Sequence, residues 1–144
     1  MTNGPPRYPN RDAASLERDL ELADSVDAAS HAVLLGVHGA ESLEVAFELQ
    51  VKWVVNLDEA IQIVPKLIDG VEIPHVFLSK GEDVLAAGEA YIVSMGDESF
   101  LGAQITNQSG HYRPLASSIA LAVKIFAKHG IIFEEAAQEP VPGS

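Results

Sequence analysis

The sequence predicts an α+β fold in which a mostly antiparallel sheet, curved or barrel-like, packs against one or two helices. Two observations lead to this class. Short segments rich in β-branched and aromatic residues follow one another across tight turns, which is typical of antiparallel strands. One segment near the C-terminus, 115–128, instead repeats its apolar residues at helical spacing. This order of elements favours a sheet covered by helices.

The N-terminal third is the least regular part of the chain. Residues 1–11 are polar and rich in proline, without the apolar stretch of a signal peptide, and we expect a disordered lead. Segments 31–37 and 44–50 are compatible with either a helix or a strand. Asp12 is placed to cap a first helix. The apolar face of that helix would consist of Leu16, Leu20, Ala23 and Val26.

The middle of the chain predicts strands. Segments 51–57 and 60–64 are short and β-rich, and a turn at 58–59 separates them. Segments 84–94 and 99–106 predict an antiparallel hairpin, because the second arm alternates apolar residues with period two.

The clearest helix follows Pro114, a residue that suits the first position of a helix. Gly130 suits the position just after its end, and 131–133 predicts a last short strand. The buried stripe of this helix is expected to be Leu115, Ile119, Ala122 and Phe126.

Length and composition indicate one domain over 12–137, followed by a disordered tail over 138–144. The chain has 144 residues, of which 47% are hydrophobic, so it can bury a core. It has no cysteine, which excludes disulfides, thiolate metal sites and cysteine nucleophiles. No apolar stretch is long enough for a membrane span, and we expect a cytoplasmic protein without a cofactor.

The net charge of −12 argues against binding to long nucleic acids, whose phosphates attract lysine and arginine. The charge is unevenly distributed, because 18 of the 21 acidic residues lie at or before Glu98 and three lie at or after Glu134. The segment between them contains Arg113, two lysines and two histidines. It is compatible with a basic helix face or with a local site for a small anion.

Two polar segments are not explained by strand or helix periodicity. The first is segment 73–81, which contains His75 and Ser79, and the second is segment 107–114, which contains the SGHYRP motif. The pKa of histidine lies near neutral pH, so two histidines can serve as general acid and general base. An arginine can hold a carboxylate or a phosphate. The candidate catalytic residues are His75 and His111, and the candidate ligand-binding residues are Ser79, Glu89, Ser109, Tyr112 and Arg113.

Each candidate also has an ordinary structural interpretation. His75 could be a solvated turn residue, and the ring of His111 could bind a backbone carbonyl. Tyr112 could cover the core, and Glu89 could be an exposed strand residue. No two histidines have the HxH or HxxxH spacing of a metal site, so we expect no metal.

Four short motifs occur in order between residues 52 and 114: KWVV at 52–55, HVFLS at 75–79, AAGE at 86–89 and SGHYRP at 109–114. Together they resemble a domain shared by plant IQ-motif (IQM) calmodulin-binding proteins and bacterial proteins, some of them toxin-like. The resemblance implies a site that includes His75 and His111, and it names no substrate. Val76 and Phe77 stand where that family carries two serines, and the chain lacks an IQ motif, so calmodulin binding is not implied.

The leading hypothesis is a small enzyme-like domain that binds a small anionic or nucleotide-like molecule. The two histidines would then perform acid/base hydrolysis or group transfer. The alternative is a non-catalytic, acidic interaction module, of an immunity or regulatory kind, that binds a basic protein. The missing serines favour the module, and the carboxylate-free segment around His111 favours the enzyme, so both remain open. Substrate, partner and oligomeric state are not specified by the sequence.

Overall fold

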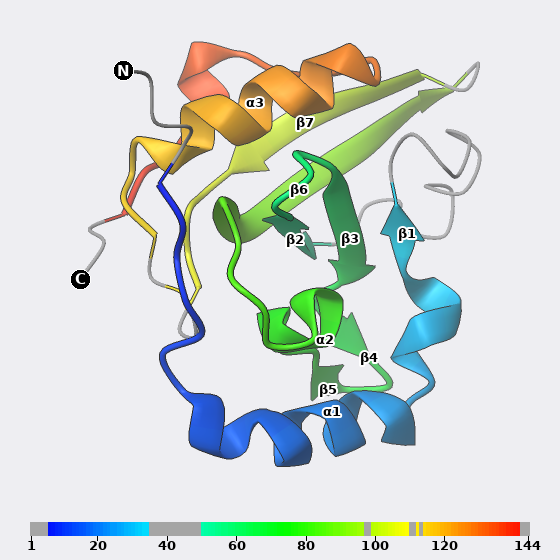
Figure 1. The fold of residues 1–144 in the computed structure, drawn as a ribbon. Coiled ribbons are helices and arrows are strands. Elements are labelled where there is room, and N and C mark those ends of the chain that lie inside the picture. The colour runs from blue at the N-terminus through cyan, green and yellow to red at the C-terminus, as the bar shows by residue number, and fades with distance from the viewer. Residues whose placement is uncertain (1–5, 35–49, 97–98, 110–111, 113, 142–144) are drawn as a thin grey trace.

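A computed structural model describes residues 6–34, 50–96, 99–109, 112 and 114–141. Their strands form a curled sheet in the order β1-β3-β2-β6-β7-β8, in which only β7 and β8 run parallel. A separate small hairpin pairs β4 with β5. The α+β class with a mostly antiparallel sheet is therefore confirmed (Figure 1). The strands are β1 Val33–Leu34, β2 Gln50–Val55, β3 Ile61–Pro65, β4 Leu67–Ile68, β5 Val71–Glu72, β6 Ala86–Gly96, β7 Ser99–Ile105 and β8 Ile131–Phe133.

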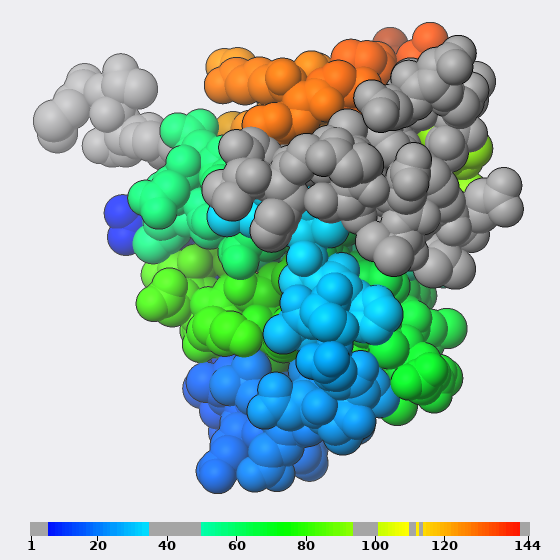
Figure 2. All heavy atoms as spheres, turned by 90° about the vertical axis from the view of Figure 1, so that its right-hand side faces the viewer, coloured from blue at the N-terminus to red at the C-terminus, as the bar shows by residue number. Residues whose placement is uncertain are grey.

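The helices lie in layers on both sides of the sheet. Helix α3 crosses the long strands at one end of the molecule, whereas α2 lies between the sheet and α1 at the other end (Figure 1). The side view shows the same order, with blue α1 and orange α3 at opposite ends (Figure 2). No helix of the described residues is long and apolar enough to cross a membrane. The α-helices are α1 Leu16–Ser25, α2 His75–Ser79 and α3 Ser118–Lys128, and the 3-10 turns are Ala13–Ser15, Ala28–His31 and Glu135–Ala137.

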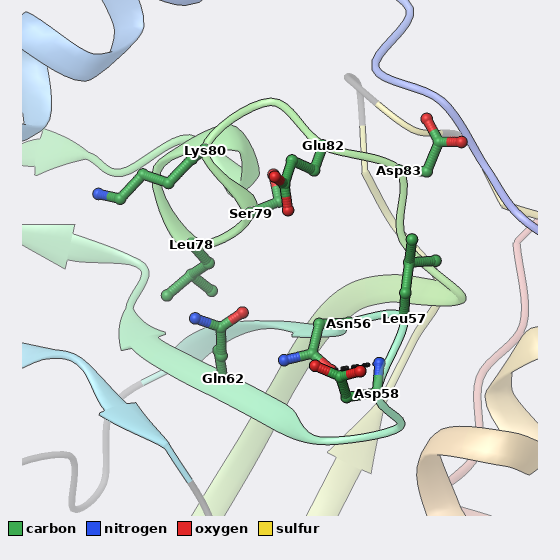
Figure 3. A pocket seen from close by; sticks show the side chains of 9 residues that line it. All are labelled: Asn56, Leu57, Asp58, Gln62, Leu78, Ser79, Lys80, Glu82 and Asp83. Carbon is green, nitrogen blue, oxygen red and sulfur yellow. Dashed lines mark hydrogen bonds between the residues drawn. The ribbon is translucent and has the colours of Figure 1, made fainter.

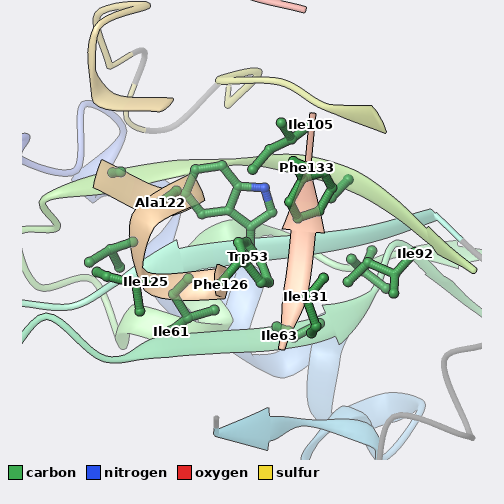
Figure 4. Close-up of a cluster of buried hydrophobic side chains, with 14 of the residues drawn as sticks. Trp53, Ile61, Ile63, Ile92, Ile105, Ala122, Ile125, Phe126, Ile131 and Phe133 are labelled. Carbon is green, nitrogen blue, oxygen red and sulfur yellow. The ribbon is translucent and has the colours of Figure 1, made fainter. Parts of the chain in front are cut away.

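Burial on both faces explains why β2 reads as an unbroken β-rich run rather than an alternating one. Val51, Trp53 and Val55 belong to the core under α3, whereas Val54 belongs to the core under α2. In the first core the Trp53 and Phe126 ring centroids lie 6.1 Å apart, edge to face (Figure 4). The sheet therefore separates two apolar cores.

The predicted hairpins and turns are present. β6 and β7 pair antiparallel, and β2 pairs with β3 across the turn that follows Val55. The last strand, β8, covers the predicted residues. Of the two segments left open between helix and strand, 31–37 contains the two-residue strand β1, and most of 44–50 lies outside the described residues.

The start of the last helix differs from the prediction. Ser117 is its N-cap, so Pro114 is not the first helical residue. Three successive tight turns precede the helix, beginning with the bond from the Ser118 N–H to the Leu115 carbonyl. Leu115 therefore lies outside the helix and is 54% exposed, where the prediction had it buried. The remaining stripe of Ile119, Ala122 and Phe126 is buried as predicted.

Described residues within both segments predicted to be disordered, 1–11 and 138–144, pair with the domain. The backbone of Tyr8 pairs with Val84, and the Tyr8 side chain is buried. Gln138 bridges to Ile105, and Asn107 holds Val141 through both its carboxamide oxygen and its nitrogen. Backbone pairing, which side-chain composition does not reveal, explains this difference.

The packing of α3 predicts a contrast between two positions. Phe126→Ala leaves a cavity in the first core and should cost about 3–5 kcal/mol of unfolding free energy. Leu115→Ala, at the exposed position before the helix, should cost less than about 0.5 kcal/mol. Urea denaturation of both variants measures the difference. Equal losses would mean that α3 begins at Pro114 and buries Leu115.

Candidate functional site

Sheet register brings two loops to the same end of the sheet. Val55, the last residue of β2, is paired with Ala86, the first residue of β6. The turn after β2 and the loop before β6 must therefore be neighbours, since antiparallel strands end and begin at the same edge. The Leu85 N–H donates to the Val55 carbonyl at 2.8 Å and closes this end. α2 leads directly into the second of these loops.

His75 begins α2 and is directed into the protein. Pro74 precedes it in an extended conformation, and only 1% of the His75 surface is exposed. Its Nε2 lies 2.7 Å from the carbonyl oxygen of Gly88 in β6. A carbonyl only accepts hydrogen bonds, so Nε2 carries a hydrogen and donates it. This contact fastens α2 to the sheet and favours a structural role for the ring.

Glycine is the only residue type that fits at position 88. A Cβ there would lie 2.7 Å from Trp53 Cζ2 and would overlap the carbonyl oxygen of Thr106. The glycine of the AAGE motif therefore lets Trp53, Thr106 and His75 approach β6.

Ser79 and Tyr112 join the two polar segments predicted from the sequence. Their hydroxyl oxygens lie 2.5 Å apart in the interior. The Tyr112 hydroxyl donates to the Glu82 carbonyl at 2.7 Å, so the Ser79 hydroxyl donates to Tyr112. The Ser79 oxygen also accepts the N–H of Gly81 at 3.2 Å. Tyr112 thus holds the loop that follows α2.

The environment of Tyr112 keeps its phenol neutral. Burial raises its pKa above the ordinary value of 10, and the Asp83 and Glu82 carboxylates raise the pKa further, against a lowering effect of the Ser79 hydrogen bond. The Tyr112 N–H donates to the Ser109 hydroxyl at 3.3 Å, which closes a local turn. Both residues therefore act as structural clamps in this geometry.

Glu89 belongs to a set of ion pairs on the same sheet face as α2. The Lys66 ammonium lies 3.0 Å from the Glu89 carboxylate, and the buried Lys52 lies 2.9 Å from Glu72. The Lys52 hydrogen bond holds the pKa of Glu72 below its ordinary value of 4.5, although burial opposes this. These contacts neutralise two lysines at the base of the β4–β5 hairpin.

A pocket of about 280 Å³ opens between the two loops, beside Ser79. We call it the Ser79 pocket. Its lining is mostly polar and comes from the turn after β2, from β3 and from the end of α2 with its following loop (Figure 3). The lining residues are Asn56, Leu57, Asp58, Gln62, Leu78, Ser79, Lys80, Glu82 and Asp83.

The charges of this pocket are unbalanced. Asp58, Glu82 and Asp83 carry side chains that form no hydrogen bond or ion pair with any described residue. Among the described lining residues Lys80 is the one cation, and its ammonium lies 4.4 Å from the centroid of the Phe77 ring. Figure 3 shows the Lys80 side chain extending away from Glu82. The pocket therefore attracts a cation and repels an anion.

The predicted site residues divide into four groups. Ser79, Ser109 and Tyr112 come together through hydrogen bonds, whereas Glu89 is engaged by Lys66. His75 lies in the interior on Gly88. His111 and Arg113 lie outside the described residues, so the predicted meeting of the two histidines stays a prediction. Among the residues that the structure describes, histidines and carboxylates form no group of three or more able to hold a metal ion.

Most residues of the Ser79 pocket were missed by the sequence analysis. Asp58 was predicted only as a turn residue, and Glu82 and Asp83 were not among the candidate site residues. The available signal was the presence of two acidic loops, one after a strand and one before the strand paired with it. Recognising that β2 pairs with β6, rather than with β3 alone, would have placed these loops together.

Removing the Tyr112 hydroxyl should loosen the loop after α2. Tyr112→Phe leaves the Glu82 carbonyl without its donor and the Ser79 hydroxyl without its acceptor, and should cost about 1–3 kcal/mol of unfolding free energy. Tyr8→Phe is the matched control, because Tyr8 is buried and its hydroxyl bonds to no described residue. Urea denaturation should show a change below about 0.5 kcal/mol for the control. Equal effects would contradict the clamp.

The role of His75 can be separated from a catalytic one. His75→Leu removes the donor to the Gly88 carbonyl and should cost about 1–3 kcal/mol. His75→Gln retains an N–H donor and should recover part of this loss. Thermal and chemical unfolding measure both variants. A leucine variant as stable as the original chain would show that the hydrogen bond does not hold α2 in place.

Comparison with known protein families, with curated proteins and with solved structures finds no match to this chain. The resemblance to the IQM domain therefore stays a prediction, and the candidate site rests on its own geometry.

Proposed function

We propose that this domain is a non-catalytic interaction module that binds a basic protein through the acidic surface around the Ser79 pocket. The observation that carries the proposal is that three carboxylates line this pocket and none of them is paired with a cation of the described residues. Elsewhere Glu72 and Glu89 are paired with lysines. At the pocket, Asp58, Glu82 and Asp83 are left to solvent.

The charge of the whole chain supports the same partner class. A net charge of −12 produces a field that attracts basic surfaces and increases their rate of encounter. The unpaired carboxylates would then select where such a partner docks. An anionic ligand would meet repulsion at this pocket.

The contacts of His75 also favour binding over acid/base chemistry. A general base has to reach the proton of a substrate within hydrogen-bond distance. His75 is almost fully buried, and its Nε2 is engaged by a backbone carbonyl. The Ser79 and Tyr112 hydroxyls are likewise engaged, in hydrogen bonds with each other and with the Glu82 carbonyl. These polar groups support the walls of the pocket.

The test compares two sets of substitutions that change the net charge equally. The pocket set is Asp58→Asn, Glu82→Gln and Asp83→Asn. The control set is Glu17→Gln, Glu21→Gln and Asp24→Asn, on the exposed face of α1. A fluorescent peptide rich in both arginine and lysine serves as the probe in anisotropy titrations at low and physiological salt.

We expect the pocket set to weaken binding about tenfold, since exposed ion pairs contribute roughly 0.2–1 kcal/mol each. The control set should weaken it less than about twofold, through the general field alone. Equal losses in both sets would show that the peptide senses only net charge, which would overturn the proposal.

A further inference from the structure

We propose that the Ser79 pocket accepts one arginine side chain, with the guanidinium among the carboxylates and the aliphatic stem against Leu57. This inference rests on the proposed function and names the group of the basic partner that enters. It depends on the size of the pocket, on the balance of acceptors and donors in its lining, and on its single exposed apolar wall.

The size of the pocket suits a side chain. Its volume of about 280 Å³ lies just below the roughly 300–1,000 Å³ of pockets that enclose drug-sized molecules. The pocket is partly open to solvent and lies between the turn after β2 and the loop after α2 (Figure 3). A single long side chain presented by a protein surface can therefore enter without the backbone following.

The lining offers hydrogen-bond acceptors in excess. Guanidinium has five N–H donors and no acceptor, and ionised carboxylates only accept. Asp58 and Glu82 supply such oxygens, and Gln62 adds a carboxamide oxygen that is not engaged by any described residue. The Asn56 oxygen is already used, because it accepts the N–H groups of Asp58 and Ala60.

An apolar wall favours a long cationic side chain over a free cation. Leu57 is 39% exposed at the rim, whereas Leu78 is buried at the back of the pocket. Arginine and lysine both lay their methylene groups along apolar surface while their charge stays among polar groups. This combination of a leucine wall and acceptor oxygens distinguishes the pocket from a simple patch of acidic residues.

The spread of the acceptors over several elements favours arginine over lysine. Acceptors come from two facing loops and from β3, and a planar fork of donors can reach several of them at once. An ammonium group is a point charge with a strongly held hydration shell, so it gains less from dispersed oxygens. Both loops are held by their own hydrogen bonds, at Asn56 and at Tyr112, which lowers the cost of ordering them on binding.

The experiment uses three peptides of one sequence, in which a single central position carries arginine, lysine or citrulline, the neutral counterpart of arginine. Binding to the full chain is measured by anisotropy. We expect the arginine peptide to bind about fivefold more tightly than the lysine peptide, because its charge-assisted bonds can be bidentate. The citrulline peptide should bind about tenfold more weakly than the arginine peptide, since the charge is lost.

The same peptides are then titrated into Asp58→Asn/Glu82→Gln and into the control Glu17→Gln/Glu21→Gln. The preference for arginine should disappear in the pocket variant and persist in the control. Equal affinity for arginine and lysine peptides, with both still weakened by the pocket substitutions, would overturn the arginine site and leave the interaction surface intact. A preference that survives in the pocket variant would place the arginine elsewhere and would also overturn the inference.

Discussion

The close approach of three chain segments at Gly88 is the constraint on which the rest of the structure depends. Its missing side chain allows the Trp53 ring and the Thr106 carbonyl to approach β6. Its own carbonyl oxygen accepts the hydrogen bond from His75. One residue thus connects the core under α3 with the core under α2, and any side chain there would separate β6 from its neighbours.

The placement of charge follows from this two-sided burial. Because both faces of the sheet are covered, Lys52 and Lys66 can lie near it only when glutamates accompany them. Carboxylates at the loop end of the sheet remain in contact with water and need no such partner. Each of these lysines is matched by one glutamate, so the two pairs leave the net charge of −12 unchanged. The acidic surface follows from composition, and the fold determines where the unpaired carboxylates lie.

The sequence predicted the parts of the fold that have a distinctive composition or a period. β2 and β3 were found from their β-rich content, and the second arm of the hairpin and the stripe of α3 from apolar spacing. It could not predict α2, because five successive buried residues have no amphipathic pattern. Leu115 was misplaced because spacing alone does not distinguish the last residue of a turn from the first of a helix.

Of the candidate site, the sequence predicted only the residues whose hydrogen bonds hold its loops in place. Ser79, Ser109 and Tyr112 stood out because their polarity breaks the pattern, and they do meet. The cavity that they support comes from loops whose acidic residues look like ordinary turn residues in the sequence. Their proximity is a property of strand pairing between positions some thirty residues apart, which no local pattern contains.

The lone tryptophan of the chain makes the first core visible to spectroscopy. Trp53 is fully buried against Phe126, and its indole N–H has no hydrogen-bond partner among the described residues. An indole in apolar surroundings that donates no hydrogen bond emits fluorescence at short wavelength, and contact with water shifts the emission to the red. The colour of this emission therefore reports the integrity of the α3 core alone. Because the other core contains no tryptophan, loosening of α1 and α2 would leave the emission unchanged, which allows the two halves to be followed separately.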